Sequence, residues 1–300
     1  FSQWMANDCT VCTTLVDTIV PGRIRDPKEA AAVAERLGYE DPFLAVREPF
    51  QMWGIQGDES LKERLPFVKA GLPGVFVTPD VTPYKKRKVR ILNGAHTAFV
   101  PGSWVAGFDI VRDCMHDETI RGFMNTMLYD EVIPTLAADL DVEDCKAFAA
   151  AVESRFDNPF IDHALLSICL NSTAKWRARD LPTLKDYVAE TGNLPKCLAT
   201  SLATLISFYT QELVSREGDG LHLRRSDGTE YTAQDDAFVL DFYAAHAGAD
   251  DAQLVHDVLT NEQMWGEDLT QIAGLEEFVV SVLAVVRAEG AKQAFANAQA

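Results

Sequence analysis

The sequence predicts a mainly α-helical protein with a few short strands near its N-terminus, and three observations lead to this fold class. First, 47% of the 300 residues are hydrophobic, which is enough to build one large domain or two small ones with a core. Second, apolar residues after Pro83 recur at helical spacing. One such stripe comprises Leu198, Leu202, Leu205, Ile206 and Tyr209. Third, no strand-like segment is followed by G-x-G-x-x-G and a helix, so we expect a nucleotide-binding Rossmann domain to be largely absent.

The individual elements follow from local signals along the chain. Residues 27–37 predict a helix, because Asp26 suits the N-cap and Pro27 suits the first helical position. Residues 49–56 and 74–77 predict short strands, being aromatic and β-branched and bounded by Gly and Pro. Residues 221–225 and 229–233, joined by Ser-Asp-Gly, predict a small exposed β-hairpin of no assigned function. Near the end, residues 275–286 carry a second apolar helical stripe.

Charge and cysteine content exclude several classes of function. The formal net charge of −18 argues against nucleic acid as a partner, because phosphate binding requires clustered cations. No run approaches ~18 consecutive apolar residues, so we expect no membrane span. The six cysteines are too sparse for a disulfide framework, and we expect them to be reduced in a cytoplasmic protein. Cys9 and Cys12 form half of a zinc pattern without a second pair, so no metal is expected.

The most informative segment is residues 83–98, a helical stretch with a basic start. At about 100° per residue, Lys88, Asn93 and His96 all fall within one half of an α-helix. A cation, an amide and an imidazole therefore converge on one side. Spacing alone favours a purely structural explanation, in which a solvated basic turn precedes an amide and a histidine satisfied in the core.

This segment resembles the Lys-x-x-x-x-Asn-x-x-His signature of the polyol-specific long-chain dehydrogenases, which act on polyols and sugar acids. The sequence around Lys88, Asn93 and His96 is most similar to that of the tagaturonate reductase (altronate oxidoreductase) branch. Further segments resemble the family in the same order along the chain. These are residues 12–22, 50–57, 155–161, 166–179 and 268–275. The resemblance implies a multi-helical domain like the C-terminal domain of 6-phosphogluconate dehydrogenase.

The resemblance also implies roles for particular residues. Lys88 would be the catalytic acid or base, Asn93 would donate to the developing alkoxide, and His96 would orient a substrate hydroxyl. A free lysine has a pKa of about 10.4, so burial and neighbouring cations must lower it for work near neutrality. Thr13 stands where many members have an asparagine that polarises the carbonyl, and Gly57 stands where mannitol enzymes have aspartate.

A sugar acid also needs cations for its carboxylate, and a basic run around residue 175 could provide them. Lys175 matches a substrate-contacting lysine of the family, with Arg177 and Arg179 as further candidates. A basic face at the end of a helix would explain the two arginines equally well. Ser167 stands where polyol-specific relatives have an arginine.

The expected organisation is a tail of a nucleotide-binding domain and connector over residues 1–45, followed by a helical substrate-binding and catalytic domain over residues 46–300. The implied activity is NAD-dependent reduction of tagaturonate to altronate, with a small sugar acid as substrate. The cofactor-binding residues are not identified, and the isolated chain is expected to be inactive without the missing nucleotide-binding domain. The alternatives are fructuronate reductase or mannitol 2-dehydrogenase and, in a different class, a non-catalytic sugar-acid-binding module.

Overall fold

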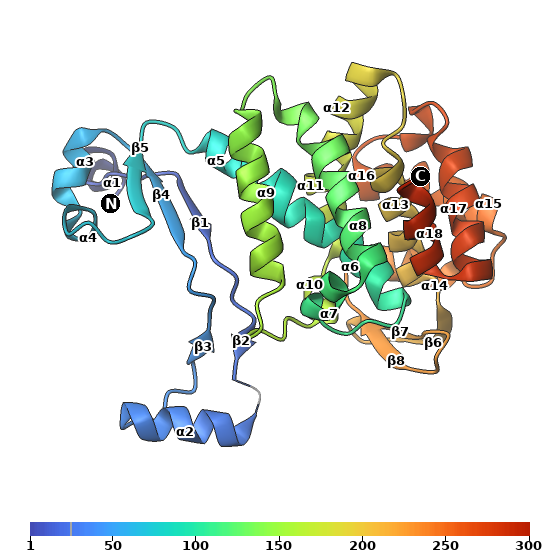
Figure 1. Cartoon of the computed structure of the whole chain (residues 1–300), viewed down its shortest axis with the longest axis horizontal. Helices are drawn as coiled ribbons and strands as arrows, with labels where there is room; N and C mark the ends of the chain where they lie inside the picture. Colours follow the sequence, from blue (N-terminus) through green and yellow to red (C-terminus); the bar gives the residue numbers. More distant parts are fainter. Residues whose placement is uncertain (25) are drawn as a thin grey trace. The chain divides into compact units, whose positions relative to one another are not determined.

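The computed structural model describes residues 1–24 and 26–300, which form two compact units, Phe1–Lys88 and Val89–Ala300. Most of these residues lie in helices and the strands are short, so the predicted fold class is confirmed (Figure 1). The division after Lys88 lies well beyond residue 45, and the assignment of residues 1–45 to a nucleotide-binding domain stays a prediction. Within the described residues, no helix has the length and apolar character that crossing a bilayer demands.

The N-terminal unit is built around a small mixed sheet. Its elements are α1 (Ser2–Asp8), β1 (Thr14–Asp17), β2 (Gly22–Arg23), α2 (Pro27–Leu37), β3 (Ala45–Val46), β4 (Met52–Gln56), α3 (Glu59–Arg64), α4 (Pro66–Lys69), β5 (Val75–Thr78) and α5 (Thr82–Arg87). Strand β4 lies in the centre of the sheet, antiparallel to β1 and parallel to β5. The short strands predicted at residues 49–56 and 74–77 are therefore present as β4 and β5.

Both faces of this sheet are covered by apolar side chains. On one face Leu15, Met52 and Val81 form a cluster, with Phe76 and Tyr84 packed against it. On the other face Ile55, Leu61 and Val77 form a second cluster that includes residues of α3 and α4. Gly54 permits the close approach of Phe76, because a Cβ at Gly54 would lie 3.2 Å from the ring. The sheet thus has a small hydrophobic core on each of its two faces.

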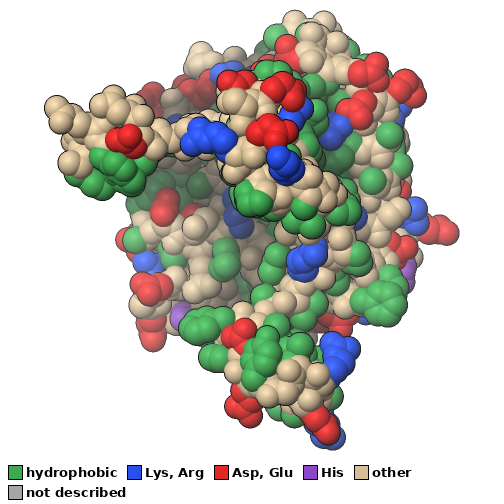
Figure 2. All heavy atoms as spheres, turned by 90° about the vertical axis from the view of Figure 1, so that its left-hand side faces the viewer, with side chains coloured by type: hydrophobic (Ala, Val, Ile, Leu, Met, Phe, Trp, Pro, Cys, Tyr) green, Lys and Arg blue, Asp and Glu red, His purple; other side chains and the backbone are tan. Residues whose placement is uncertain are grey.

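An arm extends from this sheet, consisting of the β2–β3 ribbon with α2 at its tip (Figure 1). Helix α2 spans the predicted residues because the Asp26 carboxylate accepts from the amide of Lys28 and Gly38 ends the helix with a φ of 78°. No residue of α2 is buried. Figure 2, in which the arm is at the bottom, shows its hydrophobic side chains beside acidic and basic ones.

The C-terminal unit is a multi-helical domain, preceded by a π-helical turn that joins it to α5. The elements are the π-helix η1 (Lys88–Asn93), α6 (Gly94–Val105), α7 (Val111–His116), α8 (Glu118–Thr126), the π-helix η2 (Met127–Val132), the 3-10 helix η3 (Pro134–Leu136), α9 (Val142–Phe156), α10 (Leu165–Ile168), α11 (Ser172–Arg179), α12 (Leu181–Thr191), α13 (Lys196–Tyr209), β6 (Glu212–Glu217), β7 (Gly220–Arg224), β8 (Glu230–Ala233), α14 (Ala237–Ala245), α15 (Asp251–Leu259), α16 (Glu262–Trp265), the 3-10 helix η4 (Leu269–Gln271), α17 (Leu275–Glu289) and α18 (Ala291–Ala298).

Helix α13 is the centre of this domain. Every residue from Cys197 to Tyr209 is buried, and the helix packs against both α6 and α17. The buried carboxylate of Glu131 caps its N-terminus by accepting from the amides of Cys197 and Leu198 at 2.7 and 2.9 Å. The helices expected from the apolar stripes at residues 198–209 and 275–286 are therefore confirmed as α13 and α17.

The hairpin at residues 221–233 is present, but the prediction that it is exposed was wrong. Strand β7 pairs with β8 as predicted and also with β6, which the sequence analysis did not identify. One face of the sheet is buried through Leu221, Leu223 and Tyr231. Arg225, in the turn, is also buried, because its guanidinium lies over the ring of Trp104 at 4.4 Å and donates to the Trp104 carbonyl. The sheet therefore belongs to the core of the domain.

Candidate functional site

Lys88, Asn93 and His96 lie on consecutive helical segments, but not on one α-helix. Lys88 and Asn93 begin and end the π-helix η1, and His96 follows in the first turn of α6. A π-helix bonds residue i to i+5, so the angular positions calculated for an α-helix do not apply between Lys88 and Asn93. Single π-turns inside helices are frequent at functional sites.

Lys88 is the last residue of the N-terminal unit, and its amine is held within that unit. Its Nζ donates to the carbonyl oxygen of Val16 in β1 at 2.8 Å. The bond fixes the direction of a long flexible side chain. Asn93, His96 and the cations of α11 belong to the C-terminal unit.

His96 is buried among aromatic rings in the C-terminal unit. Its imidazole stacks on Phe156 with a centroid distance of 3.9 Å and meets the edge of His163 at 5.5 Å. Burial lowers the pKa of His96 well below its ordinary value, and the charges of His163, Arg179, Arg155 and Lys175 lower it further. His96 is therefore neutral at pH 7, and its Nε2 is a buried atom with no hydrogen-bond partner among the described residues.

Two cations of α11 face the same region as His96. Lys175 and Arg179 are one helical turn apart, so they share a face of α11. The Nζ of Lys175 donates to the Ile168 carbonyl at 2.9 Å, and Nη1 of Arg179 donates to the hydroxyl of Thr97 at 3.0 Å. Burial lowers the pKa of both side chains.

The helix that carries these cations is firmly anchored. Trp176 is fully buried, and its indole Nε1 donates to the hydroxyl of Ser201 in α13 at 2.9 Å. Its ring also meets Trp265 edge-on at a centroid distance of 5.5 Å. Since large buried aromatic side chains contribute much of the packing energy of a core, α11 can hold Lys175 and Arg179 in fixed positions.

Arg179 also connects α11 to the start of α6. Its Nη1 lies 3.5 Å from the carbonyl oxygen of Asn93, which also accepts from the Thr97 hydroxyl at 2.9 Å. The backbone of Asn93 is thus held by two donors, and its side chain is partly buried one turn before His96. The structure therefore brings together Asn93, His96, Lys175 and Arg179, four of the residues that the sequence selected.

Arg177 does not join this group. It is exposed on the opposite face of α11 and lines a separate cavity of about 360 Å³. That cavity also contains Asp235, Asp236 and Gln263. The interpretation of Arg177 as the end of a basic helix face fits this position, and Arg179 is the better candidate for a substrate contact.

Thr13 lies in the N-terminal unit, just before β1. Its carbonyl accepts from the amide of Gln56 at 2.9 Å, and it lines a cavity of about 580 Å³ together with Gln56, Gly57 and Asp58. The structure thus places Thr13 beside Gly57, two positions that the sequence analysis had selected independently.

Three residues near His96 were not selected from the sequence. Phe156 and His163 contact the imidazole, and Arg155 contributes to its low pKa. The available signal was that residues 155–161 resemble the family. Arg155 is buried, and its charge disfavours the protonated form of His96.

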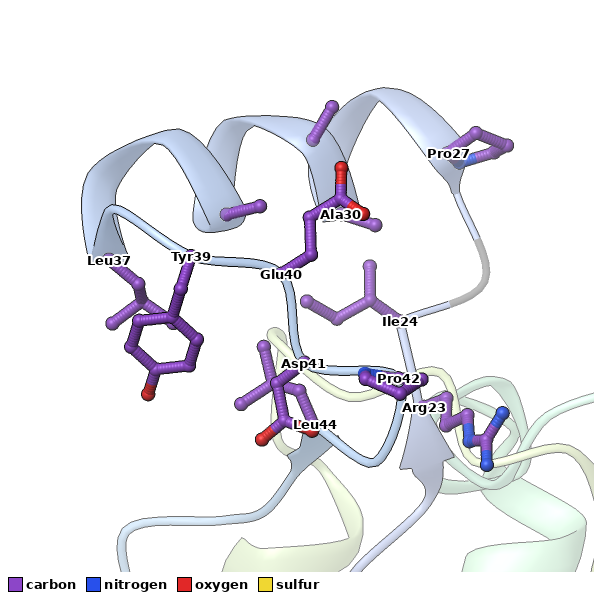
Figure 3. A pocket seen from close by; sticks show the side chains of 12 residues that line it. Arg23, Ile24, Pro27, Ala30, Leu37, Tyr39, Glu40, Asp41, Pro42 and Leu44 are labelled. Carbon is purple, nitrogen blue, oxygen red and sulfur yellow. The ribbon is translucent and has the colours of Figure 1, made fainter.

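The largest cavity described, of about 600 Å³, lies on the arm and holds none of the selected residues. Figure 3 shows Ile24 beneath α2, close to Glu40 and Pro42. The rest of its lining is mainly small and apolar, including Ala30, Ala31 and Ala34 of α2. It brings together no set of side chains comparable with that around His96.

No group of three or more His, Cys, Asp or Glu side chains in the described part of the chain could hold a metal ion. All six cysteines are free. The group around His96 offers two cations, an amide and a neutral imidazole. Such a set can bind a carboxylate and hydrogen-bond several hydroxyl groups.

Comparisons with known proteins identify the family to which the chain belongs. Residues 80–286 match the model of the mannitol dehydrogenase C-terminal domain. The altronate oxidoreductase of Yersinia enterocolitica is 41% identical over 99% of this chain and 59% of its own length, and that of Klebsiella pneumoniae is 42% identical over 98% and 58%. The chain therefore spans about three fifths of the length of these relatives.

The fold is similar to that of two solved structures. Mannitol 2-dehydrogenase of Pseudomonas fluorescens, in a ternary complex with NAD and D-mannitol, has a TM-score of 0.77 at 21% identity and covers 98% of this chain and 55% of its own. A D-sorbitol dehydrogenase in substrate-free form has a TM-score of 0.75 at 20% identity, covering 98% of this chain and 56% of its own.

Proposed function

The chain belongs to the mannitol dehydrogenase family, and on that premise we propose that it is the substrate-binding and catalytic part of an NAD-dependent sugar-acid dehydrogenase, which reduces tagaturonate to altronate. The observation that carries the choice of a sugar acid is the cation pair Lys175 and Arg179 beside the buried, neutral His96. The relatives that are about 41% identical are named altronate oxidoreductases, which supports the same substrate class.

In the proposed reaction the keto group becomes a secondary alcohol. Bound NADH would supply the hydride for this reduction, and the ammonium group of Lys88 would donate the proton to the carbonyl oxygen. The amide of Asn93 donates to the same oxygen as negative charge develops on it. His96 hydrogen-bonds a neighbouring hydroxyl, and because it is neutral one of its ring nitrogens can accept from that hydroxyl. In the reverse direction the amine of Lys88 acts as the base.

The substrate carboxylate would be held by Lys175 and Arg179. An arginine can bind a carboxylate through two parallel hydrogen bonds, and a charge-assisted bond contributes about 1.5–3 kcal/mol. Burial strengthens such an interaction because water screens it less. The uncharged substrates of polyol dehydrogenases have no carboxylate and would not form this charge-assisted bond.

The residues that the structure describes do not form a cradle for the pyrophosphate of NAD. Such a cradle combines a glycine-rich turn after a strand with the N-terminus of a long helix. In the described residues, each helix of the N-terminal unit that follows a strand directly has an aspartate or a proline at its start. We therefore place most of the nucleotide site in the remaining two fifths of the longer protein, and we expect this chain alone to be inactive.

Fructuronate reductase and mannitol 2-dehydrogenase are the alternatives within the family. Gly57 in the cavity beside Thr13 argues against mannitol, since the resemblance places an aspartate there in mannitol enzymes. A non-catalytic sugar-acid-binding module would use Lys175, Arg179 and His96 without Lys88. The two enzymes predict a different preferred substrate. The binding module predicts that the substrate is bound but that no NADH is oxidised.

The proposal is tested by purifying the full-length protein and following NADH oxidation with tagaturonate, fructuronate and fructose. We expect kcat/KM to be highest for tagaturonate and lowest for uncharged fructose, by at least roughly 10-fold, as expected for one charge-assisted bond. The 300-residue chain, folded and helical by circular dichroism, should show no turnover and no saturable NADH binding at micromolar concentrations. A preference for fructose, or micromolar NADH binding by the chain alone, would contradict the proposal.

A further inference from the structure

Asp180 is a buried acid beside the group around His96, and the roles proposed above do not use it. It directly follows Arg179 at the junction of α11 and α12. Its amide donates to the Trp176 carbonyl and its own carbonyl accepts from Leu184, both at 2.9 Å, so its backbone is fixed on both sides. The side chain is only 2% exposed, which is unusual for a carboxylate.

The carboxylate of Asp180 lies against the first residue of α6. A Cβ added to Gly94 would be only 2.8 Å from Oδ1 of Asp180, closer than real Cβ atoms normally approach. Gly94 is adjacent to Asn93, at the point where the π-turn ends and α6 begins. The absence of a side chain at Gly94 therefore allows a carboxylate to reach the backbone of this junction.

Two arginines on either side of the junction act on Asp180. Burial raises the pKa of Asp180 well above its usual range, and the charges of Arg179 and Arg90 oppose part of that rise. Each arginine has other hydrogen-bond partners. Arg179 donates to Thr97 and to the Asn93 carbonyl, whereas Arg90 donates to Thr183 and Asp186. The Oδ2 atom of Asp180 is left without a hydrogen-bond partner among the described residues. Asp180 thus meets the junction through packing against Gly94, and Oδ2 accepts no hydrogen bond from the described residues.

We propose that Asp180 is a positioning residue for Asn93, and that its carboxylate, packed against Gly94, fixes the Asn93–Gly94 junction in the geometry that the reaction needs. This inference rests on the proposed role of Asn93 as a donor to the developing alkoxide. A donor that acts only in the transition state changes kcat rather than substrate binding. Displacing such a donor by ~1 Å can cost up to about 10²-fold in rate.

The first test is Asp180→Asn in the full-length enzyme, which keeps the shape and removes the charge. We expect kcat for the sugar acid to fall by roughly 10-fold, with KM changed by less than about threefold. Gly94→Ala should lower kcat in the same way, because its methyl group displaces the Asp180 carboxylate. Circular dichroism and the melting temperature verify folding. If Asp180→Asn does not fold, Gly94→Ala alone decides the outcome through the same kcat and KM measurements.

A double-mutant cycle makes the test specific to this contact. In an Asp180→Ala background the carboxylate is gone, so Gly94→Ala should cause little further loss of kcat. Additive losses, a loss confined to KM, or a normal kcat in both single variants would overturn the inference. Lys88→Ala in the same assay separates this inference from the proposed function. An inactive Lys88→Ala with a normal Asp180→Asn overturns only the role of Asp180, whereas a fully active Lys88→Ala overturns the proposed mechanism.

Discussion

The two compact units differ in how completely they bury their apolar residues. In the C-terminal unit, α13 is buried from Cys197 to Tyr209, and ten or more residues of α6 are buried as well. In the N-terminal unit, α2 has no buried residue, and each core cluster of the sheet contains only three buried side chains. The C-terminal unit thus has the rigid framework that positions Asn93, His96, Lys175 and Arg179.

This difference shows which parts of the site can be studied in this chain. The positions of His96 and its neighbouring cations depend on contacts within the C-terminal unit and should persist in the 300-residue chain. Lys88 and Thr13 belong to the N-terminal unit, whose exposed apolar residues include Leu37, Tyr39 and Phe43. Their roles must be tested in the full-length protein.

The largest expected difference between the two units is in the free energy of unfolding that is lost when a core side chain is truncated. Phe123 is completely buried and packs on Phe295 at a centroid distance of 4.1 Å. Phe123→Ala should lower the free energy of unfolding by about 3–5 kcal/mol, since it removes apolar contacts and leaves a cavity. Leu37→Ala on the arm is the control, because Leu37 is 42% exposed and should cost less than about 0.5 kcal/mol. Equal losses in chemical denaturation would show that the two units are equally well packed.

A smaller effect is expected on KM, and it should differ between substitutions on the two faces of α11. In the full-length enzyme, Lys175→Met should raise KM for tagaturonate by roughly 10- to 100-fold, the equivalent of about 1.5–3 kcal/mol for one charge-assisted bond. Kinetics with an uncharged ketose should change far less. Arg177→Met is the matched control on the opposite face and should leave both substrates nearly unaffected. If Arg177→Met has the larger effect, the carboxylate lies on the other side of α11.

The smallest effect should be the pH dependence of stability that His96 contributes. Its pKa in the folded state is below the unfolded value of about 6.5, so below that pH the unfolded chain takes up a proton that the folded chain does not. The free energy of unfolding should therefore fall as pH is lowered below 6.5, by at most about 1.4 kcal/mol per pH unit from this residue. His96→Phe should remove that component in denaturation experiments between pH 7.5 and roughly pH 5. Identical pH dependence in wild type and variant would rule out a buried, neutral His96.

Sequence reasoning succeeded where a local signal determined the structure. The Asp26 cap, Pro27 and Gly38 define α2, and the apolar stripes define α13 and α17. It could also have separated Arg177 from Lys175 and Arg179, because residues four apart share a helix face and residues two apart do not. The spacing was available, but the three cations were treated as one group.

The remaining features depend on contacts that no local pattern encodes. The π-turn at residues 88–93 departs from ordinary helix geometry, so angles calculated for an α-helix did not apply there. Phe156 and His163 reach His96 only because α9 and the segment after it pack near α6. The hairpin at residues 221–233 was expected to be exposed, but Arg225 stacks on Trp104 and helps bury it.

The central claim is that Lys88 exchanges the proton with the substrate oxygen, and kcat of Lys88→Ala in the full-length enzyme tests it most directly. Loss of a general acid–base group should lower kcat for tagaturonate reduction by at least ~10²-fold, with the protein still folded. Lys69→Ala is the control, an exposed lysine of the same unit that pairs with Glu63 at the surface, and should retain normal kcat. A Lys88→Ala enzyme with kcat close to that of wild type would contradict the account.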